Sequence, residues 1–267
     1  AEALFMPEDD GALATALLIV PSDVPVTVRG ACSNVIIRDG GIEGLVIRLA
    51  RGFSSIAVEG DAIVAGAAAL DMTVAEHAAS AGIDGLSFLA GIPGSIGGAV
   101  VMNAGAYGSD TAAVLEWAEI MTRDGQVTRL DNAALGFAYR HSALPPGAIV
   151  LRACLRGRPG DPDAIRAHIA EIRAAREAAQ PGRARTGGST FRNPDGHKAW
   201  TLIDEAGCRG LRLGEAQVSE KHCNFLLNLG GATSADLEAL GDLVRERVRA
   251  RSGIDLHWEI KRLGKPA

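Results

Sequence analysis

The 267-residue sequence lacks the short motifs that mark the commonest nucleotide, acyl-transfer and metal sites. No two of its 33 glycines are separated by a single residue, so neither the dinucleotide-binding G-x-G-x-x-G nor a kinase-type loop is present. The P-loop, the G-x-S-x-G nucleophile elbow and the H-E-x-x-H zinc motif are also missing. A ligand, if there is one, must therefore be held in another way.

The chain is also poor in aromatic residues, has no closely spaced cysteine pair and carries a net negative charge. Aromatics make up 4% of it, so the core must be mostly Ala, Val, Ile and Leu. The net charge of −5 gives no support for nucleic-acid binding. The cysteines form no C-x-x-C pair, which argues against a zinc site or a disulfide framework and favours a reducing cytoplasm. They are Cys32, Cys154, Cys208 and Cys223. We expect no metal.

The N-terminal residues AEALFMPEDD contain no basic stretch followed by an apolar one, so we see no signal peptide. They lack an initiator Met and begin with what looks like a strand already under way, so we expect further residues upstream. Apolar residues at 47% and charged residues at 22% are typical of a globular protein. The length allows two compact domains. Alternating patterns and turn signals predict an α+β fold, strand-rich first and helix-rich later.

The predicted elements fall into two groups. Strands are expected at 25–30, 44–49, 54–60, 62–69, 117–122, 126–130, 148–155 and 257–264, and helices at 12–20, 73–82, 162–179, 201–207 and 234–251. The second helix is expected to begin at a capping box, Thr73–Glu76. A boundary rich in Pro, Gly and charge at 156–163 predicts a first domain, 1–155, with subdomains of roughly 1–50 and 51–155. A second domain would span 156–267, and its last strand would return to the active site.

The segment GIPGSIGGAVVMNAGAYG, at 91–108, contains six glycines and belongs to a stretch, 85–109, without any charge. Pro93 and Asn103 make it a poor membrane helix, and we expect no membrane span. Two interpretations stay open: tight turns around a packed core, or backbone amides that hold a phosphate. A second small-residue turn, Gly30–Asn34, follows a predicted strand, and two such loops together suit two phosphates.

Six motifs in this order span about 235 residues: RGACSNVIIRDGGIEGLVIRL, LAGIPGSIGGAVVMNAGAYG, FAYRHSAL, TGGSTFRNP, VSEKHCNFLLN and WEIKRLG. Together they resemble the UDP-N-acetylenolpyruvoylglucosamine reductase (UDP-N-acetylmuramate dehydrogenase) family of flavoenzymes. The short spacing after TGGSTF is similar to that of the family form lacking an extra tyrosine-bearing loop.

The resemblance implies an FAD-binding module of the PCMH/VAO type, made of two subdomains, and an α+β domain that binds the UDP-sugar. It also implies non-covalent FAD, NADPH as reductant, a cytoplasmic enzyme of peptidoglycan precursor synthesis, and a monomer or weak dimer. The pyrophosphate would lie on the two small-residue loops and the flavin ring beside 103–106. The cofactor contacts so implied are Gly30, Ala31, Cys32, Ser33, Asn34, Gly91, Pro93, Gly94, Ser95, Gly97, Gly98, Asn103, Ala104 and Gly105.

In the family reaction, flavin N5 gives hydride to an enolpyruvyl carbon and the neighbouring carbon is then protonated. Ser189 matches the family's proton donor, Arg140 would pair with the enolpyruvyl carboxylate, and Glu259 would act at the same end. Without the resemblance, each is an ordinary turn serine, surface arginine or strand glutamate. The implied substrate contacts are Tyr139, Arg183, Arg185, Lys221, His222 and Asn224.

The chain departs from many relatives at two places. Cys32 stands where they carry a second glycine, and we expect that the position needs no left-handed backbone. The segment Ala178–Pro181 lacks a lysine that they carry, so the cation for the diphosphate must come from elsewhere, and Arg183 or Arg185 are the candidates.

Two alternatives stay open. One is another FAD oxidoreductase of the same wider fold acting on an alcohol or sugar, although no histidine precedes His77 for covalent flavin attachment near 30–34. The other is a non-catalytic binding protein, against which the joint presence of Arg140, Ser189 and Glu259 argues.

Overall fold

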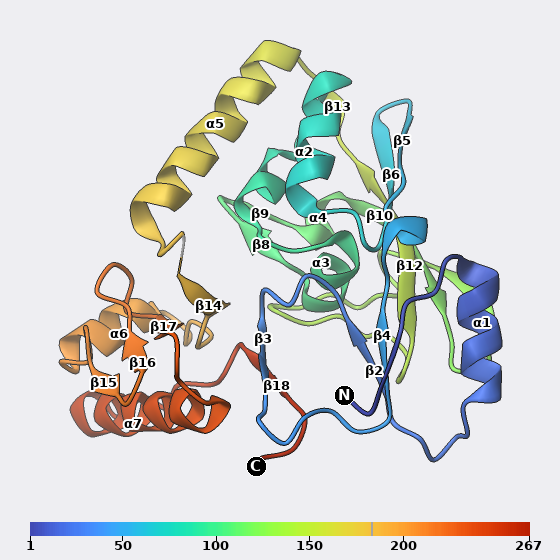
Figure 1. Ribbon diagram of the computed structural model, residues 1–267. Coiled ribbons are helices and arrows are strands. Elements are labelled where there is room, and N and C mark those ends of the chain that lie inside the picture. The colour runs from blue at the N-terminus through green and yellow to red at the C-terminus, as the bar shows by residue number, and fades with distance from the viewer. Residues whose placement is uncertain (183) are drawn as a thin grey trace. The chain divides into compact units, whose positions relative to one another are not determined.

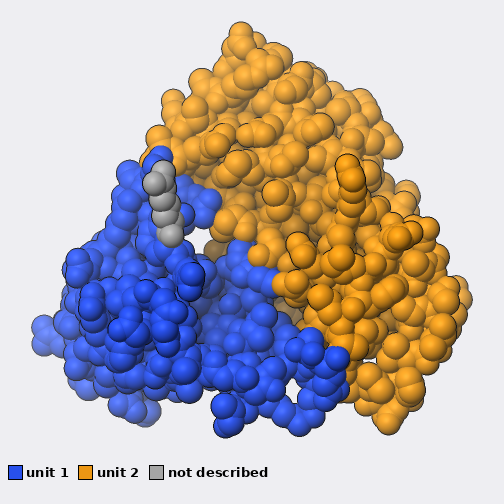
Figure 2. All heavy atoms as spheres, in the orientation of Figure 1, with its two compact units in different colours: residues 1–2, 32–43, 176–267 blue, residues 3–31, 44–175 orange. Residues whose placement is uncertain are grey.

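The computed structural model describes residues 1–182 and 184–267, and the predicted substrate contact Arg183 lies outside the described residues. The chain forms two compact units, coloured separately in Figure 2. Unit 1 comprises residues 1–2, 32–43 and 176–267, and unit 2 comprises residues 3–31 and 44–175. Helices and sheets occur in both, which confirms the α+β class (Figure 1). No helix in the described part of the chain is long and apolar enough to cross a membrane.

The N-terminal part of unit 2 builds a three-stranded parallel sheet. Its strands, in spatial order, are β1 (Ala3–Phe5), β4 (Leu45–Arg48) and β2 (Val26–Arg29). Helix α1 (Asp10–Ile19) begins after Asp9, whose carboxylate accepts a hydrogen bond from an amide of the first turn. Its buried Leu13 and Leu17 belong to one core cluster with Ile47 of β4. The sheet thereby supports the turn that follows β2 and contains Gly30.

A five-stranded antiparallel sheet forms the larger part of unit 2. In spatial order its strands are β11 (Val127–Asp131), β10 (Leu115–Met121), β12 (Ile149–Arg156), β6 (Ala62–Gly66) and β5 (Ile56–Glu59). β12 lies in the middle of the sheet, and its residues 149–151 and 153–155 are buried. A continuous apolar run of this length is typical of a central strand.

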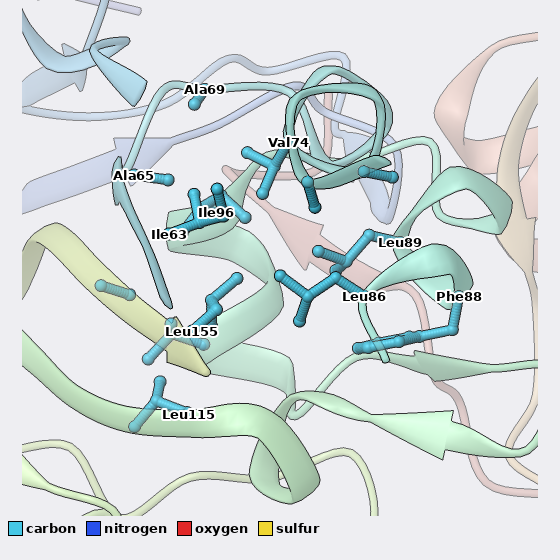
Figure 3. Close-up of a cluster of buried hydrophobic side chains, with 14 of the residues drawn as sticks. Ile63, Ala65, Ala69, Val74, Leu86, Phe88, Leu89, Ile96, Leu115 and Leu155 are labelled. Atoms are coloured by element: carbon cyan, nitrogen blue, oxygen red, sulfur yellow. The ribbon is translucent and has the colours of Figure 1, made fainter. Parts of the chain in front are cut away.

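Helical segments pack against this sheet and close the main core. They are α2 (Asp71–Ser80), η2 (Ser87–Gly91) and α3 (Ile96–Met102). Figure 3 shows Ile63 and Ala65 of β6 lying close to Val74 and Ile96 from two of these helices. Small side chains permit this close approach: a Cβ on Gly97 would lie 2.9 Å from the Cβ of Ala67. The glycine-rich segment is therefore held firmly against the sheet.

Short elements complete unit 2. They are η1 (Arg51–Phe53), β7 (Ile83–Asp84) paired with β13 (Arg158–Pro159), the hairpin of β8 (Gly105–Ala106) and β9 (Ser109–Asp110), and α4 (Thr111–Val114). Helix α5 (Pro162–Ala179) follows β13 and begins at the proline expected for its first turn.

Unit 1 is built around a four-stranded antiparallel sheet. In spatial order its strands are β14 (Arg185–Ser189), β17 (Phe225–Asn228), β16 (Ala216–Val218) and β15 (Arg212–Leu213). Helices α6 (Ala199–Glu205) and α7 (Ser234–Ser252) pack with it around a core that includes Phe191, Val218 and Leu240. Within the same unit, β3 (Val35–Ile37) pairs in parallel with β18 (Lys261–Leu263).

Several predicted boundaries differ from those in the structure by two or more residues, and three of them show how tertiary contacts override local signals. α2 begins at Asp71, not at Thr73, because the amide of Asp71 donates to the Gly94 carbonyl and Leu70 pairs with Ser95. α6 begins at Ala199, whose amide donates to the Asn193 side chain, two residues before the predicted start.

The third error concerns the last strand. Instead of 257–264, only Lys261–Leu263 forms a strand, and Trp258 makes an isolated bridge to Phe191. Glu259 therefore lies between that bridge and β18, outside any strand. The expectation that Glu259 sits on the last strand is corrected accordingly.

Candidate active site

The two loops predicted to hold phosphates meet within unit 2. A Cβ on Gly30 would lie 2.8 Å from the side-chain oxygen of Ser95, so only glycine fits this contact without a shift. Ser95 is buried and precedes the first residue of α3. The structure thus brings the beginning of the turn after β2 against the start of the Gly94–Gly98 loop.

The backbone amides of the second loop divide into two groups. Those of Ile96 and Gly97 donate to the carbonyls of Ala69 and Ala67, at 3.0 and 2.9 Å. Among the described residues, the amides of Ser95 and Gly98 have no hydrogen-bond partner. Unpaired amides in a glycine-rich, uncharged turn suit an anionic group such as a pyrophosphate.

Other predicted contacts in this segment have packing roles in the structure. Gly91 is buried, and a Cβ there would lie 2.4 Å from the ring of Tyr107. Pro93 is exposed, and the Gly94 carbonyl accepts the amide of Asp71 at 3.2 Å. The glycine at position 91 is therefore explained by packing alone, and its predicted contact with the cofactor stays a prediction.

Strained backbone is concentrated in the predicted site loops. Among the described residues, only four other than glycine have a left-handed backbone: Cys32, Asn103, Tyr107 and Arg140, with φ of 58°, 41°, 50° and 56°. All four lie in motifs that carry the family resemblance. Such conformations cost about 1–2 kcal/mol for a residue with a side chain and persist mainly at functional sites. The expectation that Cys32 needs no left-handed backbone is wrong, because its position has the geometry that a glycine adopts readily.

Within unit 2, the predicted flavin-ring segment and Arg140 are in contact. Arg140 lies at the tip of a tight turn closed by the Ala138–His141 pair, and its Nη2 lies 3.5 Å from the carbonyl oxygen of Gly105. Asn103 stabilises the same turn, because its Nδ2 donates a hydrogen bond to the Ala138 carbonyl at 3.2 Å. Its Oδ1 accepts the Ala112 amide at 2.9 Å. Asn103 thus organises the site through its side chain, while Ala104 and Gly105 supply backbone there.

Within unit 1, Ser189 and Glu259 lie on segments joined at Thr190. The Glu259 amide donates to the Thr190 carbonyl at 2.8 Å. Asn34, from the first predicted FAD loop, donates its side-chain amide to the Glu259 carbonyl at 3.3 Å. A Cβ on Gly188 would lie 3.0 Å from the Ser33 carbonyl oxygen, so this loop also runs beside the serine segment. The side chain of Glu259 is buried, with about 9% exposure. Glutamate is rarely buried unless it has a partner or a function.

The predicted substrate contacts are spread over both units. Tyr139, in unit 2, is half exposed, and the Arg140 guanidinium carbon lies 5.1 Å from the centroid of the Tyr139 ring. In unit 1, Arg185 begins β14 and Lys221 donates to the Glu177 carbonyl near the end of α5. The ring of His222 packs edge-on against Phe225 at 4.9 Å, and burial lowers the pKa of His222 below its usual value. A neutral imidazole at that position would bind as a hydrogen-bonding group rather than a cation.

Asn224 has a different environment from the one expected. It is buried, its Oδ1 accepts the Phe191 amide at 2.9 Å, and its Nδ2 donates to the Phe191 carbonyl at 2.8 Å. The sequence motif alone indicated a polar residue near the substrate and gave no sign of this backbone partner.

Sequence reasoning also missed Asp71. Its carboxyl group is fully buried, and neither oxygen has a hydrogen-bond partner among the described residues. Burial raises its pKa to about 8, against a smaller lowering by the nearby Gly94 amide. An acidic residue in the first turn of a helix is usually exposed, so no sequence signal distinguishes it. No group of residues suited to hold a metal occurs in the described part of the chain.

Comparisons with known proteins agree with this geometry. Residues 180–263 match the model for the UDP-N-acetylenolpyruvoylglucosamine reductase C-terminal domain, and residues 1–131 match that for an FAD binding domain. The UDP-N-acetylenolpyruvoylglucosamine reductase of Gluconobacter oxydans is 71% identical over 265 residues, which cover 99% of this chain and 87% of that protein. The chain belongs to the UDP-N-acetylenolpyruvoylglucosamine reductase family.

Two further members of the reductase family are similar over nearly the whole chain. The UDP-N-acetylenolpyruvoylglucosamine reductase of Granulibacter bethesdensis is 63% identical and covers 100% of this chain and 86% of its own length. The crystal structure of the Thermus caldophilus UDP-N-acetylenolpyruvylglucosamine reductase superposes with a TM-score of 0.86 at 37% identity, covering 98% of this chain and 92% of that one. The fold implied by the sequence resemblance to the reductase family is thereby confirmed.

Proposed function

We propose that the protein reduces the enolpyruvyl ether of UDP-N-acetylglucosamine to UDP-N-acetylmuramate, an FAD-dependent and NADPH-driven step of peptidoglycan precursor synthesis. Membership of the reductase family supports the reaction. The observation that carries the residue assignment is the junction at Thr190, where the segments bearing Ser189 and Glu259 are hydrogen-bonded to one another.

The residues present fit FAD. The Gly30–Ser95 contact and the unpaired amides of Ser95 and Gly98 provide an uncharged cradle for the pyrophosphate. The hairpin that begins at Gly105 would lie beside the ring. Held by these residues, FAD would supply the hydride-transfer chemistry between NADPH and the substrate. The surrounding residues contribute binding, orientation and exclusion of water.

Ser189 would protonate the carbon next to the one that receives hydride. A serine hydroxyl is a weak acid, so the groups around it must stabilise the charge left on its oxygen. Arg140 would pair with the enolpyruvyl carboxylate, which gains negative charge during the reaction, and its guanidinium fits a carboxylate through two hydrogen bonds. Its strained position at the tip of a turn is consistent with a side chain held for this purpose. Glu259 would act at the same carboxylate.

The nucleotide part of the substrate would be held by the remaining predicted residues. Arg185, together with Arg183, would supply positive charge for the diphosphate, which the segment Ala178–Pro181 does not. Lys221 and His222 would contact the sugar or diphosphate, and Tyr139 would flank the enolpyruvyl group beside Arg140. Charge-assisted hydrogen bonds from arginine to phosphate are about twice as strong as neutral ones.

We further propose that the enzyme works in the cytoplasm as a monomer or weak dimer. Cysteines kept as free thiols support a reducing compartment. The division into an FAD module, 1–155, and a substrate domain, 156–267, is also retained as a proposal. Sedimentation of the purified holoenzyme would test the association state.

The visible spectrum of the purified protein tests the proposed function. A flavin spectrum that NADPH bleaches, and that the enolpyruvyl UDP-sugar restores without oxygen, is expected. A bleached flavin that the UDP-sugar fails to restore, but that an alcohol-derived or sugar-derived acceptor restores, would contradict the proposal. A protein that binds the UDP-sugar without any change in the flavin spectrum would instead be a binding protein.

A further inference from the structure

Asn224 holds both residues that follow Ser189. Its side-chain oxygen accepts the Phe191 amide at 2.9 Å, and its side-chain nitrogen donates to the Phe191 carbonyl at 2.8 Å. Its own carbonyl accepts the Thr190 amide at 2.8 Å. One buried residue therefore satisfies every backbone amide and one carbonyl in the two positions next to the proposed proton donor.

The chain before Ser189 offers much less support. Between Thr186 and Ser189 the pairing of β14 with β17 is irregular, and Gly188 has a left-handed backbone with φ of 83°. Regular pairing resumes only at Ser189, opposite Phe225. The placement of the serine therefore depends mainly on the contacts downstream of it, at Thr190 and Phe191.

Thr190 also connects Ser189 to Glu259. Its amide is held by Asn224 on one side, and its carbonyl accepts the Glu259 amide at 2.8 Å on the other. A shift of Thr190 would move both proposed site residues at once. From this geometry we infer that Asn224 is a positioning residue, which fixes the hydroxyl of Ser189 against the substrate and does not itself touch the substrate. The inference rests on the proposed role of Ser189 and replaces the substrate contact predicted for Asn224.

The chemistry of the amide explains why asparagine stands at this position. An asparagine side chain offers one acceptor oxygen and a nitrogen with two donors, and here both ends are used by the backbone of a single residue. Aspartate has nearly the same shape but only acceptors, so it would place a carboxylate oxygen against the Phe191 carbonyl. Alanine would leave a buried amide and a buried carbonyl without partners.

Asn228, the last residue of β17, supplies a matched control four residues further along the chain. Its side chain also clamps backbone, donating to the Ala232 carbonyl at 2.8 Å and accepting the Gly230 amide at 2.8 Å. These contacts shape the loop after β17 rather than the segment after Ser189. Substitution of Asn228 thus removes the same kind of hydrogen bonds without disturbing Thr190.

The experiment compares the two half-reactions of the holoenzyme in stopped flow without oxygen, for Asn224→Ala, Asn224→Asp and Asn228→Ala. We expect both Asn224 variants to keep the rate of flavin reduction by NADPH within about twofold. Reoxidation by saturating enolpyruvyl UDP-sugar should slow by roughly 10–100-fold, the scale of a displacement of about 1 Å in a reacting group. Asn228→Ala should keep both rates. The conservative aspartate variant keeps the test usable if the alanine variant does not fold.

A double variant separates positioning from other roles. If Asn224 acts mainly by positioning Ser189, then Asn224→Asp should slow reoxidation by a smaller factor in the Ser189→Ala background, where only the displacement of Glu259 remains to be felt, than in wild type. Multiplying effects would overturn the inference, as would a loss confined to substrate affinity with an unchanged rate at saturation. Equal slowing by Asn228→Ala would also overturn it. Failure of the proposed function has a different signature, namely Ser189→Ala reoxidising at the wild-type rate.

Discussion

Replacement of Asp71 by asparagine should change how the stability of the protein depends on pH. The carboxyl of Asp71 is fully buried in the first turn of α2, and neither oxygen has a hydrogen-bond partner within residues 1–182 and 184–267. Burial raises its pKa to about 8, while the Gly94 amide lowers it by less. No charged neighbour contributes to this rise in the pKa of Asp71. The rise comes from desolvation of the ionised carboxylate.

The direction of the effect follows from proton linkage. In the unfolded chain an aspartate has a pKa of about 3.9, so between about pH 4 and pH 8 the folded protein keeps a proton that the unfolded chain has lost. The stabilising contribution of Asp71 is therefore complete below about pH 4 and is lost as the pH rises through about 8. Each pH unit in this window lowers the free energy of unfolding by about 1.4 kcal/mol. From pH 5 to pH 7 the loss is about 2.7 kcal/mol.

Urea unfolding of wild type and Asp71→Asn at pH 5, 6 and 7 measures this loss. Asparagine does not titrate. The difference in free energy of unfolding, variant minus wild type, should therefore increase by about 1.4 kcal/mol for each pH unit. Comparison with wild type at each pH cancels the other titrating groups, including the histidines. Asp163→Asn, which removes an exposed acid from the first turn of α5, is the matched control. A difference between Asp71→Asn and wild type that stays constant from pH 5 to 7 would refute the reasoning.

Three further variants test the site loops. Cys32→Gly should raise the free energy of unfolding by about 0.5–1 kcal/mol in urea titrations, because the left-handed backbone at φ 58° suits glycine; a destabilised protein would contradict this. Gly30→Ala should weaken FAD roughly tenfold when apoprotein is titrated with the cofactor, because its Cβ would lie 2.8 Å from the Ser95 oxygen, whereas Gly182→Ala, with no described atom within 4 Å of its Cβ, should not. Arg140→Ala should keep the yellow flavin and slow steady-state turnover by roughly 10²–10³-fold, with Arg140→Lys intermediate. Loss of the flavin from Arg140→Ala on purification would mark that residue as structural.

Elements with strong local signals could be predicted closely from the sequence. α5 runs from Pro162, as predicted, because proline fits a first helical turn and Pro181 follows its end. α7 was predicted to within one residue. Its Thr233 and Asp236 form a reciprocal capping box, and Gly253 ends it with a left-handed backbone.

Where contacts distant in sequence decide the outcome, local patterns failed. The residues Thr73–Glu76 resemble a capping box, but pairing of Leu70 with Ser95 starts the helix earlier. The sequence after Leu256 looks like one strand, but the bridge from Trp258 to Phe191 interrupts it. Cys32 gives no local sign of its left-handed backbone.

In the candidate site, too, some residues could be predicted from sequence motifs and others depend on contacts distant in sequence. Arg140, Ser189 and Glu259 were named through the family motifs, since nothing in their local sequence separates them from ordinary polar residues. The clamp by Asn224 depends on a partner 33 residues away in sequence. The carboxyl of Asp71 is buried by the folded core, beside a glycine 23 residues further along the chain. Such pairings emerge only when the chain is folded.

The most direct test of the central claim is the pair of half-reaction rates for Ser189→Ala, measured by stopped flow in the absence of oxygen. We expect the rate of flavin reduction by NADPH to remain close to that of wild type. Reoxidation by the enolpyruvyl UDP-sugar should slow by roughly 10²–10⁴-fold, the usual effect of losing a general acid. Ser80→Ala, which removes an exposed hydroxyl at the end of α2, should leave both rates unchanged. Equal slowing of both half-reactions, or reoxidation of Ser189→Ala at the wild-type rate, would contradict the assignment of Ser189 as the proton donor.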